Sequence, residues 1–505
     1  MKIVSLSSNF FSVSIWTLAS RILGFVRDIL MAAFLGTGPL AEAFLVAFSL
    51  PNMFRRFFAE GALNMAFVPL FSKKLDVDTE DAHSFASETF VILGTGLLIL
   101  TILAQICMPV LVFSMASGFY GDGRFDQAID LGRITFPYIL FISLAALISG
   151  ILNASGKFKT AAAAPIVLNI VLILSMISAD FLKLEISLAL AIAVPISGVL
   201  QLFLVYRSAR KIGFELKFRL PKLTPDIKKL MMIAFPAALA GGVVQINLLV
   251  GRQIASGTEG AIAWLSYADR LYQLPLGVVG IAVGIVLLPD LSRRLISDDL
   301  VGAQNAFNKS TEFALNLTIP ASLALILIPI EIITTLFERG EFNAYDSKQT
   351  AIALAIYGIG LPAFVLQKVL QPIYFAREDT KTPFRFALIA MVLNALIAIG
   401  LEPKIGFISA AIATSTAGWS MLLLLWFGTR KFKGALKFDS NFYKKILTII
   451  IASAIMGICI LLSKESFKFY FIDPNMKYFG LIYLTSIGLT SYFFSRYVLN
   501  FLFFK

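Results

Sequence analysis

The chain has 505 residues, of which 58% are hydrophobic and only 15% are charged. Soluble domains carry about 25% charged residues, and a soluble interior cannot hold this much apolar surface. The composition therefore excludes a soluble enzyme, a disordered scaffold and a disulfide-rich secreted domain, and it predicts a polytopic membrane protein. The net charge of +12 does not point to nucleic acid as a partner, because membrane proteins concentrate Lys and Arg on cytoplasmic loops.

Apolar stretches long enough for a membrane-spanning helix, about 20 residues, recur along the chain with polar and basic segments between them. A spanning β-barrel would need strands of about 10 residues that alternate apolar and polar side chains, and the run from Leu422 to Leu425 does not alternate. We therefore predict an all-α fold with fourteen transmembrane helices, at 10–34, 40–71, 86–115, 128–152, 161–181, 185–206, 227–253, 260–291, 306–337, 349–376, 383–400, 405–428, 443–463 and 477–500.

The orientation follows from the distribution of the 43 Lys and Arg residues. With the N-terminus inside, most of them fall in cytoplasmic segments, above all in 207–229 and 430–445. An even number of helices then places both termini in the cytoplasm. The first apolar run contains arginines and lacks a small-residue cleavage site, so we expect it to remain as a helix rather than to be removed as a signal peptide.

The sequence contains an internal repeat. The segment Phe67–Leu75 resembles Leu287–Leu295, and Pro137 and Asn169 recur as Pro362 and Asn394. The repeat predicts two pseudo-symmetric six-helix lobes, related by an axis along the membrane normal, which is the usual architecture of a transporter. We expect the domains to be an N-lobe at 1–210, a cytoplasmic linker at 211–226, a C-lobe at 227–430 and two extra helices at 431–505.

Charged residues at membrane depth are costly, so they normally face the protein interior and mark a pathway. Basic groups outnumber acidic ones in these positions, and a guanidinium meets two phosphate oxygens at once, so the surplus suits a phosphorylated anion. Arg56 with Glu60, and Asp269 with a basic neighbour, could instead be structural ion pairs. The candidate substrate-binding residues are Arg21, Arg27, Asp28, Glu42, Asn52, Arg55, Arg56, Glu60, Arg252, Asp269 and Arg270.

The first helix carries the arginines that we expect to contact substrate. Arg21 and Asp28 share a helix face, while Arg27 lies roughly 120° away from Arg21 around the helix. A straight helix cannot aim both guanidinium groups at one point, so we expect a bend near Gly24 or a wide cavity. Because Asp28 can neutralise only one of the two arginines, the other remains available for an anion.

The sequence contains no motif for catalysis, for a metal or for a cofactor. The single histidine, His83, lies in a polar loop, and Cys107 and Cys459 sit in apolar runs, where thiols behave as small hydrophobes. A Walker motif and a G-x-G-x-x-G fingerprint are both absent. The chain therefore cannot hydrolyse ATP itself, and a coupling ion, the membrane potential or the substrate's own gradient must drive transport.

Several motifs, in order along the chain, resemble the signature of the MurJ (MviN) lipid II flippases, a family of the multidrug/oligosaccharidyl-lipid/polysaccharide exporter superfamily. The fourteen-helix pattern extends this resemblance over the whole chain. The motifs are Arg21–Asp28, Ala43–Asn52, Arg55–Gly61, Ala66–Pro69, Tyr267–Leu271 and Leu288–Ser292.

The resemblance implies a flippase that moves lipid II, an undecaprenyl-pyrophosphate-linked peptidoglycan precursor, from the inner to the outer leaflet of the bacterial cytoplasmic membrane. It implies lipid II and membrane lipids as partners, with the cell-wall synthesis machinery as a further partner. The family's cavity arginines would fall on Arg21, Arg27 and Arg55 and, by local alignment, on Arg252. Glu42 stands where relatives commonly have Asp. The last two helices would form a groove for the lipid tail.

Other functions remain to be separated from this one. A flippase of the same fold could carry another polyprenyl-pyrophosphate-linked glycan, since the pyrophosphate is shared and only the headgroup contacts differ. A cationic-drug exporter should line its cavity with carboxylates, and the arginine surplus argues against it. A non-transporting scaffold for cell-wall synthesis would use the buried charges only structurally. A membrane-embedded glycosyltransferase lacks a visible cluster of catalytic carboxylates.

Overall fold

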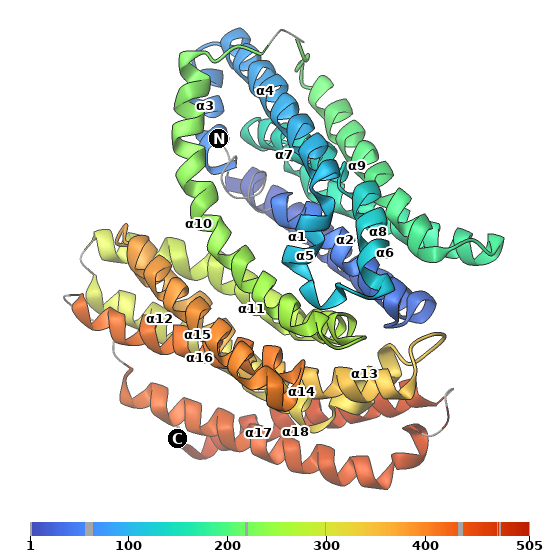
Figure 1. The fold of residues 1–505 in the computed structure, drawn as a ribbon. Helices are drawn as coiled ribbons and strands as arrows, with labels where there is room; N and C mark the ends of the chain where they lie inside the picture. The colour runs from blue at the N-terminus through green and yellow to red at the C-terminus, as the bar shows by residue number, and fades with distance from the viewer. Residues whose placement is uncertain are drawn as a thin grey trace. The chain divides into compact units, whose positions relative to one another are not determined.

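The computed structural model describes residues 3–55, 64–217, 221–297, 299–432, 438–471, 473 and 476–503. Their regular structure is helical, apart from one β-bridge between Arg339 and Phe342 (Figure 1). The chain divides into two compact units, Met1–Gly260 and Ala261–Lys505. The predicted all-α class is therefore confirmed.

The first unit is built from ten α-helices within the described residues. Long helices with prolines inside them, such as Pro51 and Pro195, alternate with short ones. The elements are α1 (Ile3–Leu35), α2 (Pro39–Arg55), α3 (Asn64–Leu75), α4 (Thr79–Ile106), α5 (Met108–Met115), η2 (Ser117–Phe119), α6 (Gly123–Thr135), α7 (Tyr138–Ala154), α8 (Phe158–Leu182), α9 (Ile186–Arg210) and α10 (Pro225–Ser256).

The second unit contains the remaining described helices. Figure 1 shows α17 running alongside α18, and the two helices pack closely. The elements are α11 (Ala261–Ile296), α12 (Leu300–Leu327), α13 (Pro329–Leu336), α14 (Ala344–Phe375), α15 (Lys381–Ile405), α16 (Ile408–Gly428), η3 (Thr429–Lys431), α17 (Ser440–Ser466), η4 (Lys468–Phe471) and α18 (Lys477–Phe503).

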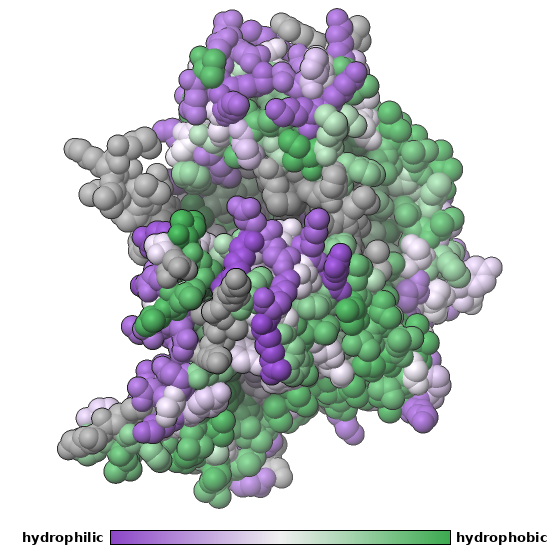
Figure 2. All heavy atoms as spheres, turned by 90° about the vertical axis from the view of Figure 1, so that its left-hand side faces the viewer, coloured by the Kyte–Doolittle hydropathy of each residue, from purple (hydrophilic) through white to green (hydrophobic). Residues whose placement is uncertain are grey.

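Every predicted span overlaps a helix or two consecutive helices. In the described part of the chain, nine spans are long and apolar enough to cross a membrane. The other five predicted spans fall on α1, α2 with α3, α10, α11 and α18, and most of these contain the charges at membrane depth. Large apolar side chains such as Phe203 and Leu462 are exposed, and Figure 2 shows wide apolar areas on the surface. Such a surface suits lipid rather than water.

Short polar side chains start several helices, as expected where the first backbone N–H groups lack partners. The Asp78 carboxylate accepts from Glu80 N at the start of α4, and Asp122 accepts from Arg124 N at the start of α6. Asn343 forms a capping box at the start of α14. These caps set the ends of the helices in the loops between the predicted spans.

The predicted linker is packed against the first unit. Phe214 is fully buried in an apolar cluster that also contains Phe67, Phe85 and Leu230. Lys217 N donates to Ser87 Oγ at 3.2 Å, so the linker backbone also contacts α4. The helix after the linker, α10, contacts α3, α4, α5 and η2 and belongs to the first compact unit. The lobe boundaries expected from the repeat remain a prediction.

Candidate functional site

The arginine pair of α1 occupies two different environments. Arg27 is buried, and its Nε and Nη2 atoms lie 3.0 and 2.6 Å from Oδ1 of Asp28, which is also buried. Arg21 is exposed, and within the described residues it forms no ion pair. Asp28 therefore engages Arg27, while the Arg21 side chain is exposed.

Asn169 of α8 completes the surroundings of Arg27. Nη1 of Arg27 donates to Asn169 Oδ1 at 3.1 Å, and Asn169 Nδ2 donates to the Ser20 carbonyl at 3.0 Å. A Cβ atom on Gly24 would lie 3.5 Å from the Asn169 amide, an ordinary van der Waals distance, so α8 passes close to α1 at this point. The helix continues unbroken through Gly24. Asn169 thus fixes the direction of the Arg27 side chain.

The candidate residues on α2 lie near the end of its described part. Asn52 is half-buried, and its Nδ2 donates to the Phe48 carbonyl at 2.8 Å. Arg55 is half-buried at the last residue of α2. Arg56 and Glu60 lie outside the described residues, so the polar stripe expected along this helix is described only at its beginning.

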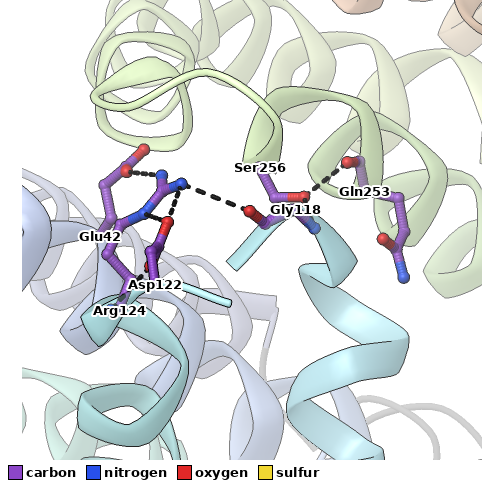
Figure 3. A network of polar contacts seen from close by, with 6 residues as sticks. All are labelled: Glu42, Gly118, Asp122, Arg124, Gln253 and Ser256. Carbon is purple, nitrogen blue, oxygen red and sulfur yellow. Dashed lines mark hydrogen bonds and ion pairs between the residues drawn. The ribbon is translucent and has the colours of Figure 1, made fainter. Parts of the chain in front are cut away.

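Glu42 forms a buried ion pair near the start of α2. Its side chain is fully buried, and Oε2 lies 2.7 Å from Nη1 of Arg124 on α6. Arg124 is also buried, with its guanidinium carbon 4.4 Å from the centre of the Phe119 ring. The pair joins α2 to α6 inside the first unit (Figure 3). Breaking such a pair on one side leaves an uncompensated buried charge.

Asp122 is the second carboxylate at Arg124. Its Oδ2 accepts from Nε and Nη2 of Arg124 at 2.9 and 2.7 Å. Partial burial alone would raise the pKa of Asp122, but the side-chain and backbone hydrogen bonds from Arg124 outweigh it and hold the pKa below its usual value. Arg124 is therefore held by two carboxylates from different segments.

Arg252 lies on α10 one residue before Gln253. It is half-buried, four residues from the C-terminal end of the helix. Its neighbour Gln253 accepts from Ser117 N at 2.9 Å, so this part of α10 lies against the connection between α5 and α6.

The two candidates of the second unit lie on α11. Asp269 is half-buried and accepts a hydrogen bond from the side-chain amide of Gln273, one turn further along. Arg270 is exposed. The two residues therefore place polar groups on adjacent positions of α11.

Sequence reasoning missed Arg124 and the role of Asn169. The predicted span began at residue 128, which assigned Arg124 to an external loop, whereas α6 begins at Gly123. Asp122 followed by a helical pattern is a start signal that could have extended the span. Asn169 was noticed only as part of the repeat, because a contact across about 140 residues leaves no local pattern.

The chain matches the sequence profile of the family described as lipid II flippase MurJ over residues 31–479. A relative from Rhizobium tropici named as a probable lipid II flippase MurJ is 47% identical over 460 residues, which cover 90% of this chain and 86% of that protein. The profile and the relative both extend over most of the sequence.

Solved structures agree with these matches. A structure titled as lipid II flippase MurJ in an inward closed conformation has a TM-score of 0.83 and 29% identity, and the alignment covers 98% of this chain and 99% of that chain. An inward-facing multidrug resistance transporter of the MATE family and MOP superfamily has a TM-score of 0.69 at 15% identity, over 81% of this chain and 94% of that chain. The second likeness concerns the fold alone.

Proposed function

The chain belongs to the MurJ family of lipid II flippases, and we propose that it moves lipid II from the inner to the outer leaflet of the bacterial inner membrane through an arginine-lined cavity. It is a multi-pass membrane transporter and not an enzyme. Lipid II, the undecaprenyl-pyrophosphate-linked precursor, is its substrate. Alternating exposure of the cavity to the two sides would follow from rocking of the lobes.

The state of the α1 arginines is the observation that carries this proposal. Arg27 is held by Asp28 and Asn169, which leaves its side chain in one fixed direction. Arg21 is exposed on the same helix. A diphosphate loses much hydration on entering a cavity, and charge-assisted hydrogen bonds from guanidinium groups offset that loss. We assign pyrophosphate binding to Arg21 and Arg27, with Arg55 and Arg252 as further contacts.

The remaining candidates divide by their surroundings. We assign Asn52, Arg56, Glu60, Asp269 and Arg270 to the polar lining of the cavity, as expected from their depth in the predicted spans. Glu42 differs from these residues, because its carboxylate is fully buried against Arg124. Its contribution to transport is therefore to hold α2 and α6 together.

We further propose fourteen membrane crossings, two six-helix lobes at 1–210 and 227–430, and cytoplasmic termini. The basic segments 207–229 and 430–445 support this orientation. The stretch 211–226 would then be a cytoplasmic linker.

We assign the lipid tail to α17 and α18, within the segment 431–505. These helices pack on each other through an apolar cluster that includes Met456, Ile460 and Leu484. Ion pairs fix α17 to the rest of its unit, with Lys445 Nζ 2.8 Å from Glu312 Oε2 and Lys464 Nζ 2.8 Å from Glu331 Oε1. A fixed apolar pair of helices can offer a polyprenyl chain a surface in the membrane.

Binding of lipid II to the purified protein tests this function. We expect Arg21→Gln to weaken binding about tenfold or more, because a charge-assisted contact to the pyrophosphate is lost. Arg133→Gln, an exposed arginine of α6, is the matched control and should bind like the wild type. Equal binding by both variants would contradict the assignment. Equal affinity for another polyprenyl-pyrophosphate-linked glycan would favour the alternative substrate.

A further inference from the structure

Gln253 of α10 closes the C-terminal end of α5. Its Nε2 donates to the Phe113 carbonyl at 2.9 Å and to the Ser114 carbonyl. Both carbonyls lie in the last turn of α5, where the helix supplies no further N–H groups to bond them. Its Oε1 accepts from Ser117 N at 2.9 Å and from Ser117 Oγ at 2.6 Å. One side-chain amide therefore bonds the last turn of α5 and the start of η2.

Ser256 and Gly118 bring the two backbones into direct contact. Gly118 N donates to Ser256 Oγ at 2.9 Å, and the same hydroxyl donates to the Gln253 carbonyl at 2.6 Å. A Cβ atom on Gly118 would lie 2.5 Å from the backbone of Ser256 and Gly257. Only glycine permits this approach. We call the contacts of Gln253 and Ser256 with residues 113–118 the α10 latch.

On the side of the latch formed by η2, Arg124 holds the chain at Gly118 and Phe119. Figure 3 shows Gly118 between Ser256 and Arg124, and Nη2 of Arg124 donates to the Gly118 carbonyl at 3.4 Å. Arg124 is itself fixed by Glu42 and Asp122 and lies over the Phe119 ring. Movement at this contact is therefore easier for α10 than for η2.

The opposite end of α10 is attached by different forces. Ile227 and Leu230 are buried in the apolar cluster of α3, α4, α7 and α9. Asp226 Oδ2 lies 2.9 Å from Lys74 Nζ at the same end. Apolar burial and an ion pair hold the N-terminal end of α10, whereas its C-terminal end is joined to α5 and η2 by the buried Ser256 hydroxyl and by hydrogen bonds of the half-buried Gln253 amide. Water can replace such hydrogen bonds at small net cost.

We propose that Gln253 is a positioning residue for transport: the α10 latch is releasable, and it must open and re-form at each transport cycle. This inference rests on the proposed function. Arg252 precedes Gln253, so the latch also sets the position of a candidate substrate contact. Since one end of α10 is packed in the apolar core, opening the latch lets the other end move without unfolding the unit.

A reversible cross-link tests whether the latch must open. Ser117→Cys and Gln253→Cys are combined in a chain whose native cysteines are replaced by Cys107→Ser and Cys459→Ala, and a short bis-methanethiosulfonate joins them. We expect lipid II transport to fall about tenfold or more after cross-linking and to return to the uncross-linked rate after reduction. Each single-cysteine variant should be unaffected by the reagent. Unchanged transport by the cross-linked protein would overturn the proposal.

Cysteine labelling at a buried position tests whether the α10 latch releases, and it does not require lipid II. Ala255 is buried beside the latch, so Ala255→Cys in the same background should react slowly with a membrane-impermeant maleimide. Gly118→Ala, which forces the backbones apart, and Gln253→Ala should each raise the labelling rate about tenfold. Gly123→Ala is the matched control, because a Cβ there meets nothing within 4 Å. Equal labelling rates in all variants would contradict the proposal that the latch holds the C-terminal end of α10.

The two tests separate failure of the latch from failure of the proposed function. Absence of lipid II transport by the cysteine-free parent would contradict the proposed function, while faster labelling of Gly118→Ala would still support release of α10. Transport that continues in the cross-linked protein would contradict the latch and leave the substrate assignment intact. Ser114→Ala, which removes a hydroxyl that donates to Leu111 within α5, should match the parent in both tests.

Discussion

Nη2 of Arg27 lies 2.6 Å from Oδ1 of Asp28, the next residue along α1, and both side chains are buried. Neighbours in sequence point away from each other on a helix by about 100°, so the long arginine side chain must fold back to make this contact. Asn169 of α8 supports it there. The pair keeps one guanidinium in a defined direction and leaves Arg21 exposed on the same helix.

Arg27 and Arg21 should therefore respond differently to loss of charge. Arg27→Gln leaves the buried Asp28 without this partner and should destabilise the protein by about 3 kcal/mol. Arg21→Gln removes an exposed group and should change the unfolding temperature by no more than a surface substitution does. Thermal unfolding in detergent measures both. Because Asp28→Asn removes the charge, the double variant with Arg27→Gln should recover stability but not lipid II binding.

Glu42 and Arg124 should behave as one coupled pair. Arg124→Leu removes the arginine partner of a fully buried carboxylate and should cost about 3 to 5 kcal/mol, while the double variant with Glu42→Leu should cost less than the sum of the single variants. Denaturation of the four proteins gives the coupling energy. Arg133→Leu, whose side chain is 46% exposed, serves as the control and should be near neutral. A coupling energy near zero would contradict the structural role of the pair.

Asp379 should stabilise the protein over a wide range of pH. The hydrogen bond from Lys431, 2.5 Å away, lowers the pKa of Asp379 to about 2. A carboxyl with a lowered pKa contributes stability above its unfolded value, near pH 4, and loses that contribution as the pH falls through about 2.

Asp379→Asn should thus lower stability equally at pH 8 and pH 5, by at most about 1 kcal/mol because the pair is partly exposed, with the difference shrinking only below about pH 4. Thermal unfolding across this range measures it. Asp130→Asn removes a carboxylate that is 76% exposed and should have no measurable effect. A loss that disappears already between pH 8 and pH 5 would contradict the assignment to Lys431.

The helices could be predicted from the sequence because the pattern that indicates them is local. Apolar runs of the length of a membrane span need no long-range information, and each of them falls on a helix. The motifs between Arg21 and Pro69 were also sufficient for the family, which the matches over most of the chain confirm. The position of α10 could not be foreseen from the repeat, because its packing on α3 and η2 depends on contacts far apart in sequence.

The candidate site was predictable in its residue types but not in its pairing. The predicted spans place arginines at membrane depth. The expectation that Asp28 can neutralise only one of the two α1 arginines agrees with its ion pair to Arg27. The partner of Glu42 was not found, because Arg124 lies 82 residues away and was assigned to a loop. Pairing between helices is decided by packing, and a single sequence does not encode it in any local pattern.

A leaflet-resolved assay of lipid II in cells that carry this protein as their only flippase tests the central claim most directly. The wild type and the Arg133→Gln control should deliver lipid II to the outer leaflet at the same rate, while Arg21→Gln, present in equal amount and folded, should leave lipid II in the inner leaflet. Delivery by Arg21→Gln at the wild-type rate would contradict the claim that the exposed guanidinium group of Arg21 holds the pyrophosphate during transport.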